Sequence, residues 1–324
     1  MKKIDVTVLL PILNEDENIE KVIEELNEVL ASTKFTYEIL GINTPDKPGT
    51  FEILEKLGNR FENFYPINMK YSGGARKLQK GYQYLLGFMI AKGEKIVHMD
   101  SDYEDDPRDI PNMIAKLDEG YDLVVGWRTN RKHTAFYRFT SKIYNSVANA
   151  ITGVRIHDKN CGIKAYRAEA AKALSLHGQN FRGIPLLLQA KGYRITEIPV
   201  NNRERLGGKG HWNFWTRFLA GIFDLPSNIL ISRSSDMPFR FWGGVGYFFL
   251  MTGFVGLLAY GYKVWFGTYT FEKVVVLISI SMVLFILGFL SLITGILMEY
   301  ILDQKHITLE DFSILDDPKD RVKT

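Results

Sequence analysis

Residues 1–235 alternate short apolar runs with longer segments in which apolar residues recur at helical spacing. The short runs are rich in β-branched residues and are bounded by turn residues, as buried strands are. Strands are predicted at 6–10, 37–42, 64–68, 95–99 and 123–126. Helices are predicted at 18–30, 50–57, 74–91 and 107–119. This alternation predicts an α/β fold with a doubly wound, mostly parallel sheet.

Beyond residue 238 the pattern changes to two long apolar segments. Phe241–Tyr262 and Val274–Met298 contain no charged residue, and a helix needs about 20 apolar residues to cross a bilayer core. Two buried core helices are the alternative, but core helices are usually shorter and keep a polar face. The short connection at 263–273 therefore predicts a hairpin of two transmembrane helices.

The segment that precedes this hairpin mixes large apolar residues with polar ones. Within 211–238, aromatic and aliphatic side chains recur at roughly helical spacing, interrupted by Arg217 and Asp224. The pattern predicts an amphipathic helix in the plane of the lipid headgroups, with a packing helix under the head as the alternative. The predicted organisation is a head domain at 1–210, an interfacial segment at 211–238, two transmembrane helices at 239–302 and a cytoplasmic tail at 303–324.

Charge around the hairpin predicts its orientation. The N-terminus lacks the pattern of a signal peptide, because Lys2 and Lys3 precede only a short apolar run that acidic residues follow. Basic residues also favour the cytoplasmic side of a membrane. They are more numerous outside the hairpin (Arg217, Arg233, Arg240, Lys305, Lys319, Arg321 and Lys323) than in its loop (Lys263 and Lys273). We therefore expect an integral membrane protein with a cytoplasmic head.

Composition excludes several classes of protein. A chain of 324 residues that is 46% hydrophobic and 24% charged is neither disordered nor collagen-like. A formal net charge of +3 is too balanced to indicate nucleic acid as a partner. The single cysteine, Cys161, excludes an internal disulfide framework and a cysteine-built zinc site.

The most informative local feature is the segment VHMDSDYEDDP, in which a predicted strand runs directly into Asp100 and Asp102. Ligands of doubly wound sheets bind beyond the carboxyl ends of the strands. Carboxylates there suit Mg²⁺ or Mn²⁺, which prefer hard oxygen ligands and share them with phosphates. The alternative is an ordinary solvated acidic loop.

Basic residues follow the next predicted strand. Arg128 and Arg131 stand just beyond it, with Lys132 and Arg138 close behind. A guanidinium binds phosphate with two parallel hydrogen bonds, so this cluster indicates a phosphate site, with a solvated basic face as the alternative.

Five segments in order carry a resemblance to a known family: VTVLLPILNEDENI, MDSDYEDDP, DLVVGWRTNRK, SKIYNSVANAITGVRIHDKNCGIKAYR and GYRITEIPVNNRERLGGKG. Together they resemble family 2 glycosyltransferases of the inverting, GT-A fold kind. The resemblance is to the polyprenyl-phosphate branch, which includes dolichol-phosphate mannose synthases and undecaprenyl-phosphate glucosyltransferases with a C-terminal two-helix anchor. It covers residues 5–210.

The resemblance implies a role for each matching position. Donor binding falls to Pro11, Asn14, Glu15, Asn43, Asp46, Asp100 and Asp102, and metal binding to Asp100 and Asp102. Acceptor-phosphate binding falls to Arg128, Arg131, Arg138 and Ser141, and the lid over the diphosphate to Arg203, Arg205 and Lys209. Asp158 matches an acidic residue near the acceptor, considered as a base, and a turn cap is its alternative.

Several segments depart from the family's pattern. The second strand ends in GINTPDKPGT, where Asn43 and Thr44 stand in place of the usual acids and Asp46 alone remains nearby. The segments NMKYSGG, QNFRGIP and RLGGKGHW are also atypical. These departures predict unusual donor selectivity or weak donor affinity, and they leave a catalytically degenerate membrane scaffold as an alternative.

The implied activity is the inverting transfer of a sugar from a nucleotide-diphosphate donor to the phosphate of a polyprenol, with Mg²⁺ or Mn²⁺ as cofactor. The expected partners are the nucleotide sugar, the lipid phosphate and the membrane, with no nucleic acid; a homo-oligomer is compatible with this interpretation. A processive polysaccharide synthase is a further alternative. It usually has more membrane spans and a QxxRW motif, which Gln189–Arg194 does not supply.

Overall fold

The computed structural model describes residues 3–13, 18–44, 49–71, 79–129, 156–176, 180–204, 238–267, 271–304, 309 and 312–319. The chain divides into two compact units. The first, the head, comprises Met1–Ile229 together with Ile307–Thr324, and the second comprises Leu230–His306. The segment expected to lie in the headgroup plane falls outside the described residues except for Pro238, which begins a helix.

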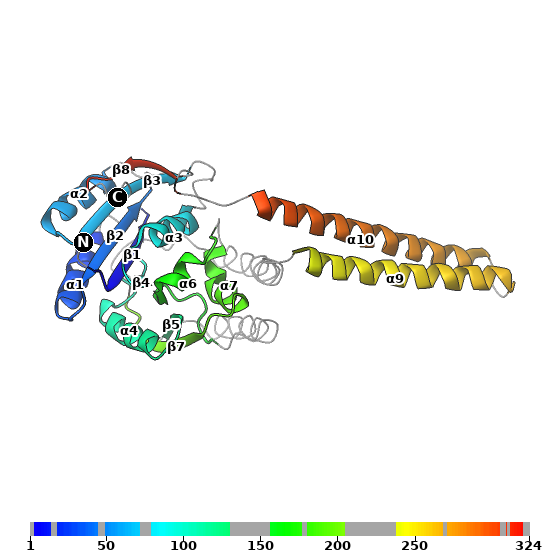
Figure 1. Cartoon of the computed structure of the whole chain (residues 1–324), viewed down its shortest axis with the longest axis horizontal. Coiled ribbons are helices and arrows are strands. Elements are labelled where there is room, and N and C mark those ends of the chain that lie inside the picture. Colours follow the sequence, from blue (N-terminus) through cyan, green and yellow to red (C-terminus); the bar gives the residue numbers. More distant parts are fainter. Residues whose placement is uncertain are drawn as a thin grey trace. The chain divides into compact units, whose positions relative to one another are not determined.

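The head is built on one sheet, which has eight strands among the described residues (Figure 1). Its order is β7-β5-β6-β4-β1-β2-β3-β8. The strands are β1 Val6–Ile12, β2 Tyr37–Asn43, β3 Phe64–Tyr71, β4 Lys95–His98, β5 Leu123–Arg128, β6 Lys164–Arg167, β7 Ile195–Val200 and β8 Phe312–Asp316. Four of the seven neighbouring pairs are parallel, which confirms the mostly parallel sheet.

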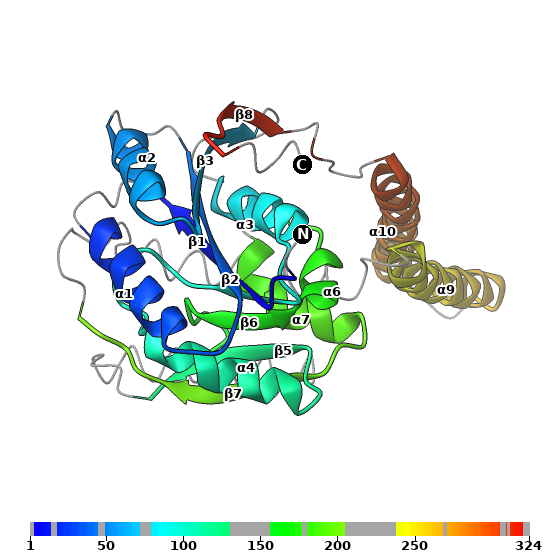
Figure 2. The same ribbon diagram turned by 60° about the vertical axis from the view of Figure 1, so that its left-hand side comes forward.

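Helices cover both faces of this sheet, as Figure 2 shows for α2 and α3 around β3. They are α1 Ile19–Ala31, α2 Thr50–Arg60, α3 Gln79–Ile90, the 3-10 helix η2 Pro107–Asp109, α4 Ile110–Asp118, α6 Ala168–Lys172, the 3-10 helix η3 Asn180–Gly183 and α7 Ile184–Ala190. Each main helix buries the apolar stripe that its periodicity predicts; on α1 this comprises Ile19, Val22, Ile23, Leu26 and Leu30.

The path of the chain locates the place where a ligand can bind. The chain moves in one direction across the sheet from β1 to β2 to β3, and then returns to place β4 on the other side of β1. Right-handed crossovers therefore put α1 and α2 on one face and α3 on the other. The loops that follow β1 and β4 diverge at this switch point, which is where doubly wound sheets bind ligands.

Two strands in the β4 half of the sheet are not among the sequence predictions. β6 lies antiparallel between β4 and β5, and β7 lies parallel to β5 at one edge. β6 has only four residues, with Lys164 and Arg167 at its ends, so its apolar content is too small to identify it. β7 contains Glu197 and Pro199, which suit an edge position and weaken the strand pattern.

The C-terminal residues differ from the expected tail. Phe312–Asp316 forms β8, which pairs antiparallel with β3 and closes the other edge of the sheet, beside β3 in Figure 1. Beyond the strand, Lys319 Nζ donates to the carbonyl oxygens of Phe61, Glu62 and Phe64 at 3.2, 3.0 and 2.8 Å. A five-residue strand that follows two membrane helices carries no local pattern that identifies its partner strand, so its place in the head could not be predicted.

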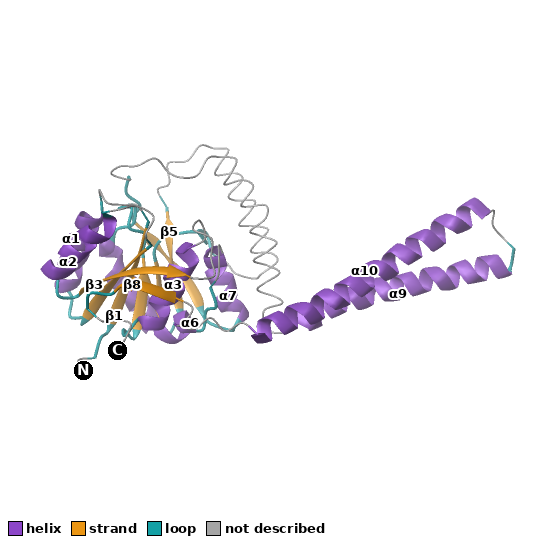
Figure 3. Cartoon of the chain, turned by 90° about the horizontal axis from the view of Figure 1, so that it is seen from above, coloured by secondary structure: helices purple, strands orange, loops and turns teal. Residues whose placement is uncertain are grey.

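The second unit is a pair of long helices, α9 Pro238–Trp265 and α10 Phe271–Gln304, which lie side by side in Figure 3. Their apolar cores, Phe239–Trp265 and Val275–Met298, are long enough to cross a membrane. Large apolar side chains remain exposed along both helices, as lipid contact requires and water does not favour. The chain is therefore a membrane protein with a two-helix hairpin.

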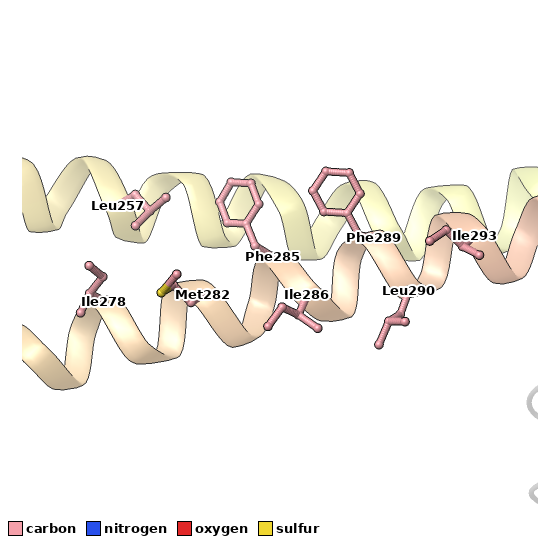
Figure 4. A pocket seen from close by; sticks show the side chains of 8 residues that line it. All are labelled: Leu257, Ile278, Met282, Phe285, Ile286, Phe289, Leu290 and Ile293. Carbon is pink, nitrogen blue, oxygen red and sulfur yellow. The ribbon is translucent and has the colours of Figure 1, made fainter.

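Glycines bring the two helices into close contact. An added Cβ on Gly288 would lie 2.7 Å from Leu250 Cγ and 2.9 Å from the carbonyl oxygen of Gly246. Nearby, Ser291 Oγ donates to the carbonyl oxygen of Trp242 over 2.8 Å. Beside this seam an apolar groove is lined by Leu257, Ile278, Met282, Phe285, Ile286, Phe289, Leu290 and Ile293 (Figure 4). Its lining suits lipid acyl chains.

Gly288→Val is expected to force the two helices apart, because the new side chain meets the backbone carbonyl oxygen of Gly246 as well as the Leu250 side chain. Overpacking of this kind destabilises by about 1–3 kcal/mol. Gly244→Val is the matched control, since nothing lies within 4 Å of an added Cβ there. The thermal loss of helical ellipticity in detergent should occur at lower temperature for Gly288→Val alone. Equal melting temperatures for both variants would contradict this account of the helix contact.

Candidate active site

The acidic turn lies at the switch point between β1 and β4. Ser101 Oγ donates to the carbonyl oxygen of Pro11 over 2.9 Å, which ties the turn to the end of β1. Asp102 Oδ1 accepts from the backbone N–H of Glu104 over 3.2 Å. Tyr103 has a φ of 70°, the one positive value among non-glycine residues in the described part of the chain. Such strain is typical of functional turns held by their surroundings.

Asp100, the first acid of this turn, is held by side chains from α3. Lys80 Nζ donates to Asp100 Oδ1 over 2.7 Å, and Tyr84 Oη donates to the same oxygen over 3.2 Å. Burial opposes ionisation of Asp100, but the charge and hydrogen bond of Lys80 hold its pKa well below the usual range. Asp100 therefore presents a permanent carboxylate at the switch point.

A third acid lies behind the first two. Asp105 Oδ2 accepts from the backbone N–H of Asp100 over 3.2 Å, and the Asp105 side chain is buried. Burial, and then the charge of Asp100, raise the pKa of Asp105. An added Cβ on Gly162 would lie 2.5 Å from Asp105 Oδ2 and 3.2 Å from Asp100 Oδ2. Only glycine allows the loop before β6 to approach these carboxylates so closely.

That same loop carries Asp158, which forms an ion pair with Arg128 at the end of β5. Arg128 Nε donates to Asp158 Oδ2 over 2.7 Å, and Nη2 donates to Oδ1 over 3.1 Å and to the carbonyl oxygen of Asn160 over 2.9 Å. Both side chains are nearly buried, at 7% and 11% exposure. Burial opposes the charge of Arg128, but its hydrogen bond with Asp158 raises the Arg128 pKa further above its usual range.

The ion pair changes the interpretation of Asp158. The sequence leaves a base or a turn cap as the role of Asp158, whereas in the structure both of its carboxylate oxygens accept hydrogen bonds from the guanidinium of Arg128. A carboxylate held in this way is a weak base, since its protonation would break two charge-assisted hydrogen bonds. Its contact with Arg128 suits an orienting role.

Two lysines near these acids have no counterpart in the sequence predictions. Lys80 opens α3, a helix that the sequence predicts without assigning any of its side chains to the site. Lys164 begins β6 and is buried, and its Nζ donates to the carbonyl oxygen of Cys161 over 2.5 Å. Burial lowers the Lys164 pKa, while the charges of Asp100 and Asp158 act in the opposite direction. The sequence carries no local signal for Lys164, because the four residues of β6 do not form a recognisable apolar strand pattern.

Arg203, assigned to the lid, is bound elsewhere. Its guanidinium donates to Glu25 Oε2 and Oε1 over 2.6 and 2.8 Å and pairs with Asp106 Oδ1 at 2.5 Å. It also lies over the ring of Tyr103, 4.9 Å from the centroid. In the described structure Arg203 thus connects the segment after β7 to α1 and to the acidic turn. A contact with diphosphate remains a prediction.

At the far side of the switch point, polar side chains follow β2. Asn43 and Thr44 are each 2% exposed, and Gln83 is fully buried. Gln83 Nε2 donates to the carbonyl oxygens of Ile12 and Ile42 over 3.0 and 2.8 Å, which joins the ends of β1 and β2. Among the described residues, Asn43 Oδ1, Thr44 Oγ1 and Gln83 Oε1 have no hydrogen-bond partner. Buried polar atoms of this kind are usually satisfied by a ligand or water.

In the structure, the carboxyl ends of the parallel strands place the following residues on the same side of the sheet: Pro11, Asn43, Asp100, Asp102, Arg128 and Asp158. Arg203 is described as well, but it binds Glu25 and Asp106. The remaining predicted site residues lie outside the described part of the chain: Asn14, Glu15, Asp46, Arg131, Arg138, Ser141, Arg205 and Lys209. Their roles stay predictions.

Asp100 and Asp102 fit a divalent cation that a bound ligand also coordinates. Both residues supply hard carboxylate oxygens. Within the described ranges, no three histidine, cysteine, aspartate or glutamate side chains gather around a metal position. The two carboxylates would thus form part of a coordination sphere that a bound diphosphate completes, as is usual for Mg²⁺.

A mostly parallel sheet with an acidic turn at its switch point agrees with the GT-A fold of glycosyltransferases. Residues 7–175 match the model of the family described as glycosyl transferase family 2, which is more than half of the 324 residues. The chain therefore belongs to glycosyl transferase family 2.

Known proteins resemble this chain in sequence or in fold. Dodecaprenyl-phosphate galacturonate synthase of Rhizobium johnstonii is 28% identical over 251 residues, which are 76% of this chain and 72% of that protein. Glucosyl-3-phosphoglycerate synthase of Mycobacterium tuberculosis, solved with Mn²⁺, UDP-glucose and phosphoglyceric acid, is similar with a TM-score of 0.52 and 16% identity over 71% of this chain and 79% of that one. Its complex with Mg²⁺ and UDP has a TM-score of 0.50 and 17% sequence identity, again over 71% of this chain and 79% of that one.

Proposed function

We propose that this glycosyltransferase moves a sugar from a nucleotide-diphosphate donor to the phosphate of a membrane polyprenol, with inversion at the anomeric carbon. The observation that carries the proposal is the close approach at Gly162, which places the Arg128–Asp158 ion pair beside the acidic turn. The acidic turn suits a donor diphosphate, and the arginine suits a second phosphate next to it. The hairpin and the name of the Rhizobium relative support a lipid as the carrier of that second phosphate.

One group of residues binds the donor and another binds the acceptor. Asp100 and Asp102 would hold Mg²⁺ or Mn²⁺, which neutralises charge on a leaving diphosphate. Lys80 keeps Asp100 ionised, and the strained turn at Tyr103 fixes the direction of Asp102. This division is supported by the metal-bound complexes of the mycobacterial synthase, which contain Mn²⁺ or Mg²⁺ with UDP.

On the acceptor side, Arg128 binds the lipid phosphate and Asp158 orients the guanidinium. A phosphate monoester is already anionic near neutral pH, because its second pKa is about 6. Its oxygen can attack the anomeric carbon without a general base, so positioning supplies most of the rate enhancement. The reaction leaves the nucleoside diphosphate and a sugar joined to the lipid phosphate.

We place the head on the cytoplasmic face. The head contains residues from both sides of the hairpin, so both ends of the hairpin emerge on one side of the membrane. The excess of basic residues outside the hairpin favours the cytoplasm for that side.

Membranes that contain the protein test the proposal. They are supplied with undecaprenyl or dolichyl phosphate, Mn²⁺ and a panel of radiolabelled UDP- and GDP-sugars that includes a galacturonate donor. The expected result is label in the organic phase that requires the lipid phosphate and is released by mild acid. No transfer from any donor, together with no binding of any nucleotide, would favour a degenerate scaffold instead.

A further inference from the structure

Three side chains on adjacent strands form a hydrogen-bond relay at the edge of the sheet. Asn68 Nδ2 on β3 donates to Asp316 Oδ2 on β8 over 3.1 Å. Asn43 Nδ2 on β2 donates to Asn68 Oδ1 over 2.9 Å. Strand register supports both contacts, because Asn68 lies opposite Asn43 in one ladder and opposite Asp316 in the other. The relay therefore connects the C-terminal strand to the end of β2.

The relay has a direction that its chemistry determines. An ionised carboxylate only accepts hydrogen bonds, so Asn68 must turn its NH₂ group toward Asp316. Its carbonyl oxygen then faces Asn43, which must in turn present its own NH₂ group. The remaining atom, Asn43 Oδ1, is left as an acceptor that is buried and has no partner among the described residues.

The C-terminal strand is held in place independently of Asp316. Phe312 is buried against the head at 5% exposure, and Lys319 donates to three backbone carbonyl oxygens. A register shift in the β3–β8 ladder falls between Asn68 and Met69, directly at the relay. Irregularities of this kind re-aim side chains next to active sites. Asp316 itself is exposed, so a substitution there leaves the packed core intact.

We propose that Asp316 is a positioning residue for the donor: through Asn68, it fixes the amide of Asn43 so that Asn43 Oδ1 accepts a hydrogen bond from an N–H or O–H group of the donor nucleoside. This inference rests on the proposed function, and on the family resemblance that assigns donor binding to Pro11 and Asn43 at the ends of β1 and β2. The end of β2 lacks a carboxylate at Asn43 and Thr44. Asp316, a carboxylate on the C-terminal strand, takes the place of that missing carboxylate. Through Asn68 it keeps Asn43 Oδ1 turned toward the donor as a hydrogen-bond acceptor.

The first test replaces the carboxylate by an amide. Asp316→Asn can face Asn68 with either end of its amide, so Asn43 loses its fixed orientation. Calorimetric titration with UDP and with GDP, each with Mn²⁺, should show a roughly two- to tenfold loss of affinity, the range for one net hydrogen bond. The donor KM should rise by a similar factor, while the acceptor KM stays unchanged. Asp118→Asn, an exposed aspartate outside the relay on α4, is the charge-matched control.

The second test uses the direction of the relay. Asn43→Asp would place an acceptor-only group at each end of Asn68, so one of them must face the Asn68 carbonyl oxygen. Adding Asp316→Asn removes this conflict, because Asn68 can then turn over. Asp316→Asn should therefore weaken nucleotide binding in the native background and strengthen it in the Asn43→Asp background. An effect of the same sign and size in both backgrounds would overturn the relay.

The outcomes separate this inference from the function on which it rests. If the native protein binds neither nucleotide and transfers no sugar, the proposed function fails and the inference with it. If the native protein binds and transfers, but Asp316→Asn behaves like Asp118→Asn, the function stands and the inference is wrong. A rise in both KM values with a lower melting temperature would show that Asp316 serves the fold and not the donor.

Discussion

Asp102→Ala is expected to abolish sugar transfer while the protein still folds and inserts into the membrane. Asp102 is one of the two acids that would hold the metal, and Lewis-acid stabilisation is worth several kcal/mol, or about three orders of magnitude in rate. The Asp102 side chain lies in the turn beyond β4, where it accepts a hydrogen bond from the backbone N–H of Glu104, and is not part of the apolar core. Transfer of radiolabel to lipid is the measurement, with melting temperature as the check on folding.

The control for this prediction is Asp118→Ala, which removes an exposed acid that pairs with Lys95. It should leave transfer unchanged. Excess EDTA should reproduce the Asp102→Ala result in the native protein. Transfer that persists in both the variant and the chelated protein would show that the acidic turn does not act through a divalent cation.

Arg128→Ala is expected to weaken the lipid acceptor far more than the donor. A hydrogen bond to a charged group contributes about 1.5–3 kcal/mol, so the acceptor KM should rise roughly ten- to hundredfold. The variant also removes the arginine that neutralises the charge of the nearly buried Asp158, which is strongly destabilising. Steady-state kinetics with each substrate varied in turn will separate the two KM values.

A second substitution separates the loss of contact from the loss of the ion pair. Arg128→Ala combined with Asp158→Ala removes both charges and should recover stability but not acceptor binding. Asp158→Asn alone should keep measurable transfer with an unchanged pH profile, since Asp158 orients Arg128 and takes no proton. A new dependence on pH in that variant, or equal changes in both KM values for Arg128→Ala, would contradict these assignments.

Much of the fold was predictable because its strands carry strong local signals. Val6–Ile12 is buried at every position, and apolar runs of this kind identify a central strand without any knowledge of its neighbours. The acidic turn was predictable for the same reason, since it directly follows such a strand. β6 and β8 were not predicted because they are short and take their stability from their partners in the sheet.

The contacts within the site depend on register rather than on local sequence. Arg128 and Asp158 are separated by 30 positions in the chain, and their pairing follows from how β5 lies against β6. The same is true of Lys80, which reaches Asp100 only because α3 crosses the opposite face of the sheet from α1. Sequence patterns indicated which residue types the site needs, but not which of them bind one another.

The position of β8 in the chain sets the order in which the protein can be completed. The ribosome makes β3 early and β8 only after both hairpin helices, because Phe312–Asp316 follows Gln304. Until then the edge of β3 is open, and an open edge can pair with other chains. The nascent head therefore acquires β8, and with it Asp316, only once the hairpin has been synthesised. A chain truncated before the hairpin would lack the strand that orients Asn43. The donor site is therefore completed only in chains that also carry the membrane hairpin.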